Sequence, residues 1–158
     1  MEMQPLRSSL ADTLQWQGAH VSFSQAVEAL DLTVVSSSDH GGPYTIWQLV
    51  EHIRIAQHDI VSFCFDEHYE ESNWPSDYWP DEDGPKDTAQ WKHSLARIHQ
   101  DRQRMIDAVM DESIDLFEPI ARGNGQHVFR EAMLIIDHES YHTGQIVLIR
   151  KLLGNWNL

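Results

Sequence analysis

Hydrophobic residues recur at steps of three and four in four separate segments of this 158-residue chain. Such spacing places them on one side of an α-helix, and no segment shows the alternation that a β-strand requires. The predicted helices span residues 5–30, 45–65, 88–110 and 126–154. Four amphipathic helices without strands indicate an all-α fold, which we expect to be a four-helix bundle in one domain over residues 1–158.

Local signals mark several ends of these helices. Thr45 is followed three residues later by Gln48, the pattern of a capping box at a helix start. Asp87 or Thr88 is a suitable N-cap for the third helix. Gly154 is expected to follow the last helix as a C′ residue, where a positive φ is common.

The connection over residues 68–87 is long and rich in Trp, Tyr, Pro and Asp. Loops of this length in a compact domain are usually functional or packed over another part of the fold. Its aromatic side chains have two interpretations: they cap the end of the bundle, or they form the wall of a substrate pocket. Capping is favoured, since buried aromatic residues contribute large areas to a core.

The last predicted helix carries two histidines, His138 and His142, inside its apolar stripe. Because they are four residues apart, both imidazoles point to the same side of the helix. They are either buried histidines satisfied by hydrogen bonds or two metal ligands from one rigid element. The apolar residues that share their face are Leu134, Ile135, Ile149 and Leu152.

A metal site needs at least a third ligand, and His52 is the best candidate. It lies at the edge of the apolar face of the helix over residues 45–65, the element expected to pack on the last helix. His52, His138 and His142 would form a three-histidine site whose fourth position holds water. That arrangement is typical of a catalytic site more than of a closed structural one.

A second stripe of apolar and small residues runs down the other side of the last helix. A helix that is apolar on both sides is either central in its fold or packed against a partner chain. We therefore predict a homodimer formed through this stripe, which comprises Phe129, Met133, Ile136, Ser140, Gly144 and Val147.

The composition excludes several classes of partner. The chain has 25 acidic and 11 basic residues, a net charge of −14, and no basic run. Such a surface repels phosphate backbones and anionic lipids, so neither nucleic acid nor membrane is an expected partner, and a small-molecule substrate is expected instead.

The N-terminal residues lack the basic and apolar regions of a signal peptide, and no stretch approaches the roughly 18 apolar residues of a membrane span. A single cysteine, Cys64, excludes an intrachain disulfide and fits a reducing compartment. We therefore expect a cytoplasmic protein.

Over essentially its whole length the chain resembles the DinB/YfiT-like superfamily of metalloenzymes. The resemblance rests on GGPYTIWQLVEHIRIAQHDI, on the WPSDYWP loop and on DHESYHTGQIVLIRKLLGNW. The histidine of the second helix together with the later HxxxHxGQ is the hallmark of that family. The resemblance implies metal ligands at His52, His138 and His142, a divalent ion such as nickel or zinc, and a four-helix bundle that is commonly dimeric.

Three functions remain open. Relatives in this superfamily include thiol-dependent transferases, so the favoured interpretation is S-transfer with an external low-molecular-weight thiol whose pKa the metal lowers. A local basic patch would then be needed for an anionic thiol, with Arg54, Arg150 and Lys151 as candidates. A metal-dependent hydrolase using metal-bound water is the second interpretation, with Glu51 or Asp59 as its candidate base. A non-enzymatic, metal-bound dimeric binding or stress protein is the third, and no catalytic or thiol-binding residue is assigned.

Overall fold

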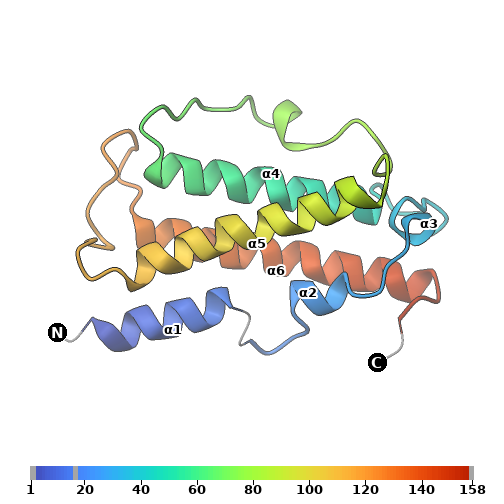
Figure 1. Cartoon of the computed structure of the whole chain (residues 1–158), viewed down its shortest axis with the longest axis horizontal. Coiled ribbons are helices and arrows are strands. Elements are labelled where there is room, and N and C mark those ends of the chain that lie inside the picture. The colour runs from blue at the N-terminus through green and yellow to red at the C-terminus, as the bar shows by residue number, and fades with distance from the viewer. Residues whose placement is uncertain (1–2, 16–17, 157–158) are drawn as a thin grey trace.

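The computed structural model describes residues 3–15 and 18–156, and this part of the chain is all-α. It contains six α-helices and one 3-10 turn but no β-strand (Figure 1). The prediction of an all-α fold is therefore confirmed. The elements in chain order are α1 (Gln4–Leu14), α2 (Phe23–Ala26), α3 (Leu32–Val35), α4 (Ile46–Phe65), the 3-10 turn η1 (Ser76–Tyr78), α5 (Thr88–Met110) and α6 (Val128–Leu152).

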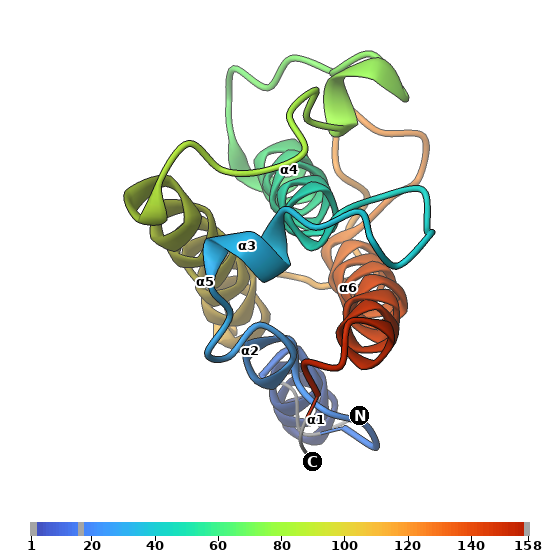
Figure 2. The same cartoon turned by 90° about the vertical axis from the view of Figure 1, so that its right-hand side faces the viewer.

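The three longest helices, α4, α5 and α6, lie side by side, and α1 packs against α5 and α6. The end view in Figure 2 shows these four helices together, with the short α2 and α3 crossing the near end. α6 also contacts α2 and α4, so it touches four other helices. None of the described helices is both long and apolar enough to cross a membrane.

The starts of α4 and α5 follow the predicted caps. The Thr45 hydroxyl accepts a hydrogen bond from the Gln48 amide, and the Gln48 side chain accepts one from the Thr45 amide, which completes the capping box. Asp87 caps α5 by accepting from the Gln90 amide at 2.8 Å. At the end of α6, Gly154 has the expected positive φ of 67°. These signals are local in sequence, which is why they predict the boundaries well.

The single first helix predicted over residues 5–30 is wrong. α1 ends at Leu14 and a separate short helix begins at Phe23, after the extended residue Ser22. Ser22 and Gln25 form a second capping box, in which each side chain accepts from the other residue's backbone amide, and this starts a new helix. Trp16, which was expected in the stripe of the first helix, lies outside the described residues.

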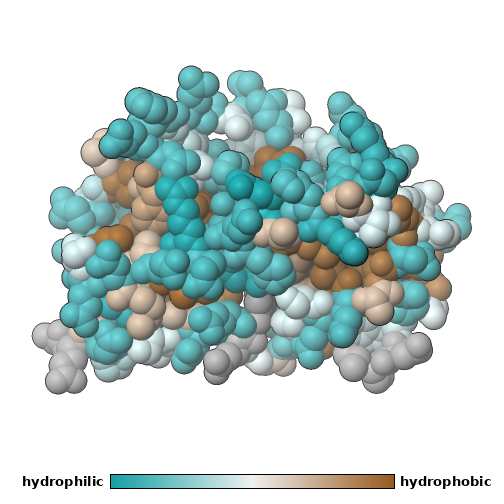
Figure 3. All heavy atoms as spheres, in the orientation of Figure 1, coloured by the Kyte–Doolittle hydropathy of each residue, from teal (hydrophilic) through white to brown (hydrophobic). Residues whose placement is uncertain are grey.

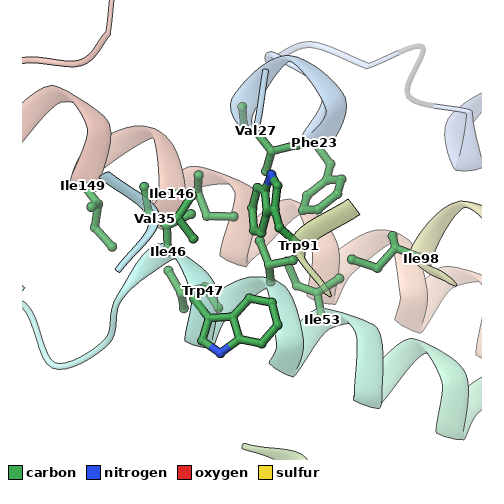
Figure 4. Close-up of a cluster of buried hydrophobic side chains, with 13 residues drawn as sticks. Phe23, Val27, Val35, Ile46, Trp47, Ile53, Trp91, Ile98, Ile146 and Ile149 are labelled. Atoms are coloured by element: carbon green, nitrogen blue, oxygen red, sulfur yellow. The ribbon is translucent and has the colours of Figure 1, made fainter. Parts of the chain in front are cut away.

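The core consists of two apolar clusters. The first joins α2 and α3 to the N-terminal half of α4 and the C-terminal half of α6, and Trp47, Phe23 and Trp91 are its largest members (Figure 4). The second joins α1 to the opposite halves of α4 and α6, around Met105 and Leu116. Hydrophilic side chains cover most of the face shown in Figure 3, with hydrophobic patches between them.

Buried polar residues separate these two clusters along α4, α5 and α6. We call Gln57, Arg102 and Glu139 the polar layer, since all three are buried. Arg102 of α5 is hydrogen-bonded and ion-paired to Glu139 of α6, and the Gln57 side chain of α4 donates to the carbonyl of Ile98 at 2.6 Å. The pair fixes how α6 is rotated against α5, because a buried charge is costly unless its partner faces it.

The predicted dimer stripe on α6 is only in part at the surface. Phe129 and Ile136 pack against the second cluster and Val147 against the first, while Met133 and Gly144 are exposed. α6 contacts four helices, so most of its circumference is already covered. The homodimer stays a prediction. The large apolar side chains that α6 does expose are Met133, Tyr141, Leu148 and Leu152, of which Leu152 was expected on the face of His138.

The ion pair of the polar layer gives a prediction for stability. Glu139→Ala should lower the free energy of unfolding by about 3–5 kcal/mol, because the buried Arg102 guanidinium loses a charged partner. The double variant Arg102→Met/Glu139→Leu should lose less than either single change. Urea denaturation measures both. Arg97→Ala removes a guanidinium that lies 4.0 Å from Asp101 and is more than a third exposed, so it serves as a control costing less than about 1 kcal/mol. Additive losses in the double variant would contradict the coupling.

Candidate metal centre

The packing of α4 on α6 brings His52, His138 and His142 together. The Nε2 atoms of His52 and His138 lie 3.0 Å apart, and one ring nitrogen from each of the three residues falls within 4.8 Å of the others. A tetrahedral ion with nitrogen ligands at about 2.0–2.1 Å separates two of them by about 3.3 Å. The three side chains that the sequence singled out therefore converge at a spacing that can hold a metal ion.

The second nitrogen of two of these rings is already engaged. His52 Nδ1 lies 2.8 Å from the backbone carbonyl of Tyr78, and His142 Nδ1 lies 2.6 Å from the side-chain oxygen of Gln145. Since both partners are acceptors, each Nδ1 carries the proton and donates. Each of these two neutral rings therefore has an unprotonated Nε2 atom, whose lone pair is the one that can bind a metal.

Burial keeps these histidines neutral. Desolvation, and after it the neighbouring imidazoles of His142 and His52, together lower the pKa of His138 to about 3. Desolvation also lowers the pKa of His52 and of His142, and the hydrogen bonds that these rings donate to Tyr78 and Gln145 oppose this effect. At neutral pH all three rings are therefore unprotonated at one nitrogen and available as ligands.

The loop between α4 and α5 runs along α4 (Figure 1), and its aromatic side chains reach the histidine cluster. The indole of Trp79 stacks on the His52 ring, with centroids 3.9 Å apart and planes within 5°. Tyr44 stacks on Trp79 in turn, at 4.1 Å. The favoured interpretation of this loop was a cap over the end of the bundle. Trp79 does pack against the first apolar cluster, and it also lies beside the histidine cluster, where it stacks on His52.

Asp59 anchors this loop to α4. Its two carboxylate oxygens accept hydrogen bonds from the phenols of Tyr69 at 2.9 Å and Tyr78 at 2.8 Å. Burial, then the hydrogen bond to Asp59, raises the pKa of both phenols well above the usual range, so they remain donors. Tyr78 thus joins Asp59 through its side chain to His52 through its carbonyl.

Two other groups considered as functional are occupied by structural contacts. Glu51 receives three hydrogen bonds from the Arg54 guanidinium, so these side chains neutralise each other. Arg150 is buried and donates to the carbonyls of Ala26 and Glu28 at 2.8 and 3.1 Å, which satisfies the end of α2. Of the three candidates for a basic patch, Lys151 is exposed, whereas Arg54 is half-buried and Arg150 is buried.

Cys64 is not suited to act as a nucleophile. Burial raises the pKa of its thiol to about 12, and the carboxylate of Glu131 contributes in the same direction. It packs against the second apolar cluster. At neutral pH it is therefore an inert thiol, as its position on the apolar side of α4 predicted.

Two partners of the histidines were not identified from the sequence. Gln145 lies three residues after His142 on the same helix, a spacing at which side chains meet, so this contact was detectable. The Tyr78 carbonyl was not detectable, because a backbone acceptor does not depend on which side chain the residue carries.

A scan of protein-family models and searches of curated proteins and of solved structures each gave no match to this chain.

The Gln145 contact gives a prediction for metal affinity. Gln145→Ala should weaken zinc binding by about 10–100-fold, because His142 loses the acceptor that fixes its tautomer and orientation. Gln145→Glu keeps an acceptor at the same place and should retain affinity near that of the parent. Competition with a chromophoric chelator measures both dissociation constants. Equal affinity in the parent and the alanine variant would show that this hydrogen bond does not orient a ligand.

Proposed function

We propose that this chain is a metal-dependent enzyme of the DinB/YfiT-like type, built on a four-helix bundle. His52, His138 and His142 bind one divalent transition metal ion, with nickel or zinc as the preferred metals for three imidazole ligands. The observation that carries the proposal is the convergence of three neutral imidazoles. In two of them, His52 and His142, the Nδ1–H group already donates a hydrogen bond, to the Tyr78 carbonyl and to the Gln145 side chain.

The number of ligands favours a catalytic role over a structural one. Among the described residues, the cluster that can hold an ion consists of these three histidines alone. Structural zinc sites usually have four protein ligands, whereas catalytic sites have three and leave a position for an exogenous ligand. A three-histidine centre is therefore suited to bind a substrate or cosubstrate directly.

The favoured reaction is transfer to an external thiol. A divalent ion held by three imidazoles lowers the pKa of a coordinating thiol, which makes the thiolate available near neutral pH. Its sulfur would form a bond to an electrophilic carbon of the substrate, the leaving group would depart with its bonding electron pair, and the thiol proton would pass to solvent. Cys64 does not supply the sulfur because its pKa is raised to about 12.

The surrounding carboxylates support thiol transfer over hydrolysis. Hydrolysis requires a group that accepts a proton from water, and Glu51 and Asp59 were the candidates. Glu51 is paired with Arg54, and both oxygens of Asp59 accept from tyrosine hydroxyls. Neither is poised as a general base, whereas a thiol with a lowered pKa does not need one.

Elemental analysis tests the metal centre. Protein purified without an affinity tag or chelator should contain about one divalent transition metal ion per chain, and His138→Ala and His142→Ala should lose it because two imidazoles hold the ion poorly. His93→Ala, which removes an exposed histidine of α5, is the matched control and should keep the metal. Unchanged metal content in the two α6 variants would overturn the three-histidine site.

Thiol dependence tests the reaction. Metal-loaded protein should consume an electrophile such as a haloarene only when a low-molecular-weight thiol is present, and a chelator should abolish the rate. Cys64→Ser should keep the full rate, since the buried thiol takes no part. Turnover of esters or amides without thiol would assign the centre to hydrolysis instead. No turnover of either class by a metal-loaded protein would favour a binding role.

A further inference from the structure

Two strongly exposed aromatic rings border the histidine cluster. Trp74 of the α4–α5 loop is 71% exposed, and its indole centroid lies 6.5 Å from that of His52. Tyr141 of α6 is 66% exposed, and its ring lies 4.9 Å from His142 at a steep angle. A ligand that occupies a fourth position on the metal shares its surroundings with rings from two separate elements.

The exposure of Trp74 is imposed by a well-bonded turn. Asp77 accepts from the Asn73 amide and side chain and from the Ser76 hydroxyl, at 2.9, 3.1 and 3.0 Å. The Trp74 ring also meets the edge of Tyr78, whose phenol is bound to Asp59. The chain therefore holds a tryptophan side chain in water at a fixed place beside the centre.

Contact with the histidines distinguishes these two rings from other exposed apolar residues. Scattered hydrophobic side chains such as Met133 and Leu148 are ordinary on a protein surface and need no ligand to explain them. Trp74 and Tyr141, in contrast, each touch a proposed metal ligand, and Trp79 already stacks on His52. These three rings present apolar faces and no positive charge, so they favour a flat, apolar group over an anion.

We propose that the metal centre takes a ligand with a flat, uncharged aromatic group next to its metal-binding atoms, and that Trp74 and Tyr141 set this preference. The inference rests on the proposed metal centre and names the class of substrate that it accepts. Aromatic pairs gain energy beyond the area they bury when ring centroids lie 4.5–7 Å apart. An aromatic ligand should therefore bind better than a saturated one of the same size.

Two matched zinc-binding probes test the preference. Benzohydroxamate and cyclohexanecarbohydroxamate carry the same metal-binding head on a flat and on a puckered ring. Titration calorimetry of the zinc-loaded protein should show that benzohydroxamate binds about two- to tenfold more tightly. Trp74→Leu and Tyr141→Leu should each reduce this ratio, because leucine keeps apolar area without a ring. Trp74→Phe and Tyr141→Phe should preserve it, and Met133→Leu, remote from the cluster on α6, should leave it unchanged.

Each outcome separates the inference from the metal centre beneath it. Equal binding of the two probes, or a preference that survives both leucine variants, overturns the aromatic site while leaving the metal centre intact. If the protein takes up no zinc, both the proposed metal centre and this inference are wrong. Sedimentation of the same variants covers a further case: if the leucine changes weaken self-association but leave the probe ratio unaltered, a second copy of the chain occupies these rings and the inference is wrong.

Discussion

The position of the histidine cluster depends on how α6 is rotated within the fold. His138 and Glu139 are consecutive, so their side chains leave the helix about 100° apart. One meets His52 of α4 and the other meets Arg102 of α5. A small rotation of α6 would separate both contacts at once, and the buried ion pair makes that rotation costly. The two apolar clusters supply the driving force for helix packing, and the polar layer between them selects one rotation of α6 against α5.

Helices and one loop make different contributions to the histidine cluster. The helices supply the three imidazoles, whose separation is set by packing of α4 on α6. The loop between α4 and α5 supplies the Tyr78 carbonyl that orients His52 and the Trp79 indole that stacks on it. Asp59 joins the two parts, because it belongs to α4 and receives both tyrosine hydroxyls of the loop.

Much of this arrangement could be predicted from the sequence because its signals are local. The signals for helix ends involve residues that are close in sequence, and the ends that they predict are confirmed. They are the capping box of Thr45 and Gln48, the N-cap Asp87 and the C′ residue Gly154. The start of α2 carries the same kind of signal, since Gln25 follows Ser22 at the capping-box spacing. One continuous helix was predicted here because apolar residues recur at helical spacing on both sides of Ser22.

Contacts between distant segments were harder to predict. His52 was placed near His138 and His142 by its position on an apolar face, and the structure brings the three together. The role of Arg150 could not be foreseen, because a solvated arginine and one that satisfies buried carbonyls look alike in a sequence. The path of the aromatic loop along α4 depends on Asp59, whose two partners lie 10 and 19 residues away.

The backbone contact to His52 has a consequence for how such a centre diversifies. A carbonyl oxygen is present whatever side chain its residue carries, so the acceptor that orients this imidazole does not constrain the composition of the turn around it. The exposed Trp74 can therefore be exchanged while His52 keeps its tautomer, because the Tyr78 carbonyl is held in place by other contacts of the turn. The proposed preference for a ligand and the proposed orientation of a metal ligand would therefore depend on separate parts of the same short segment.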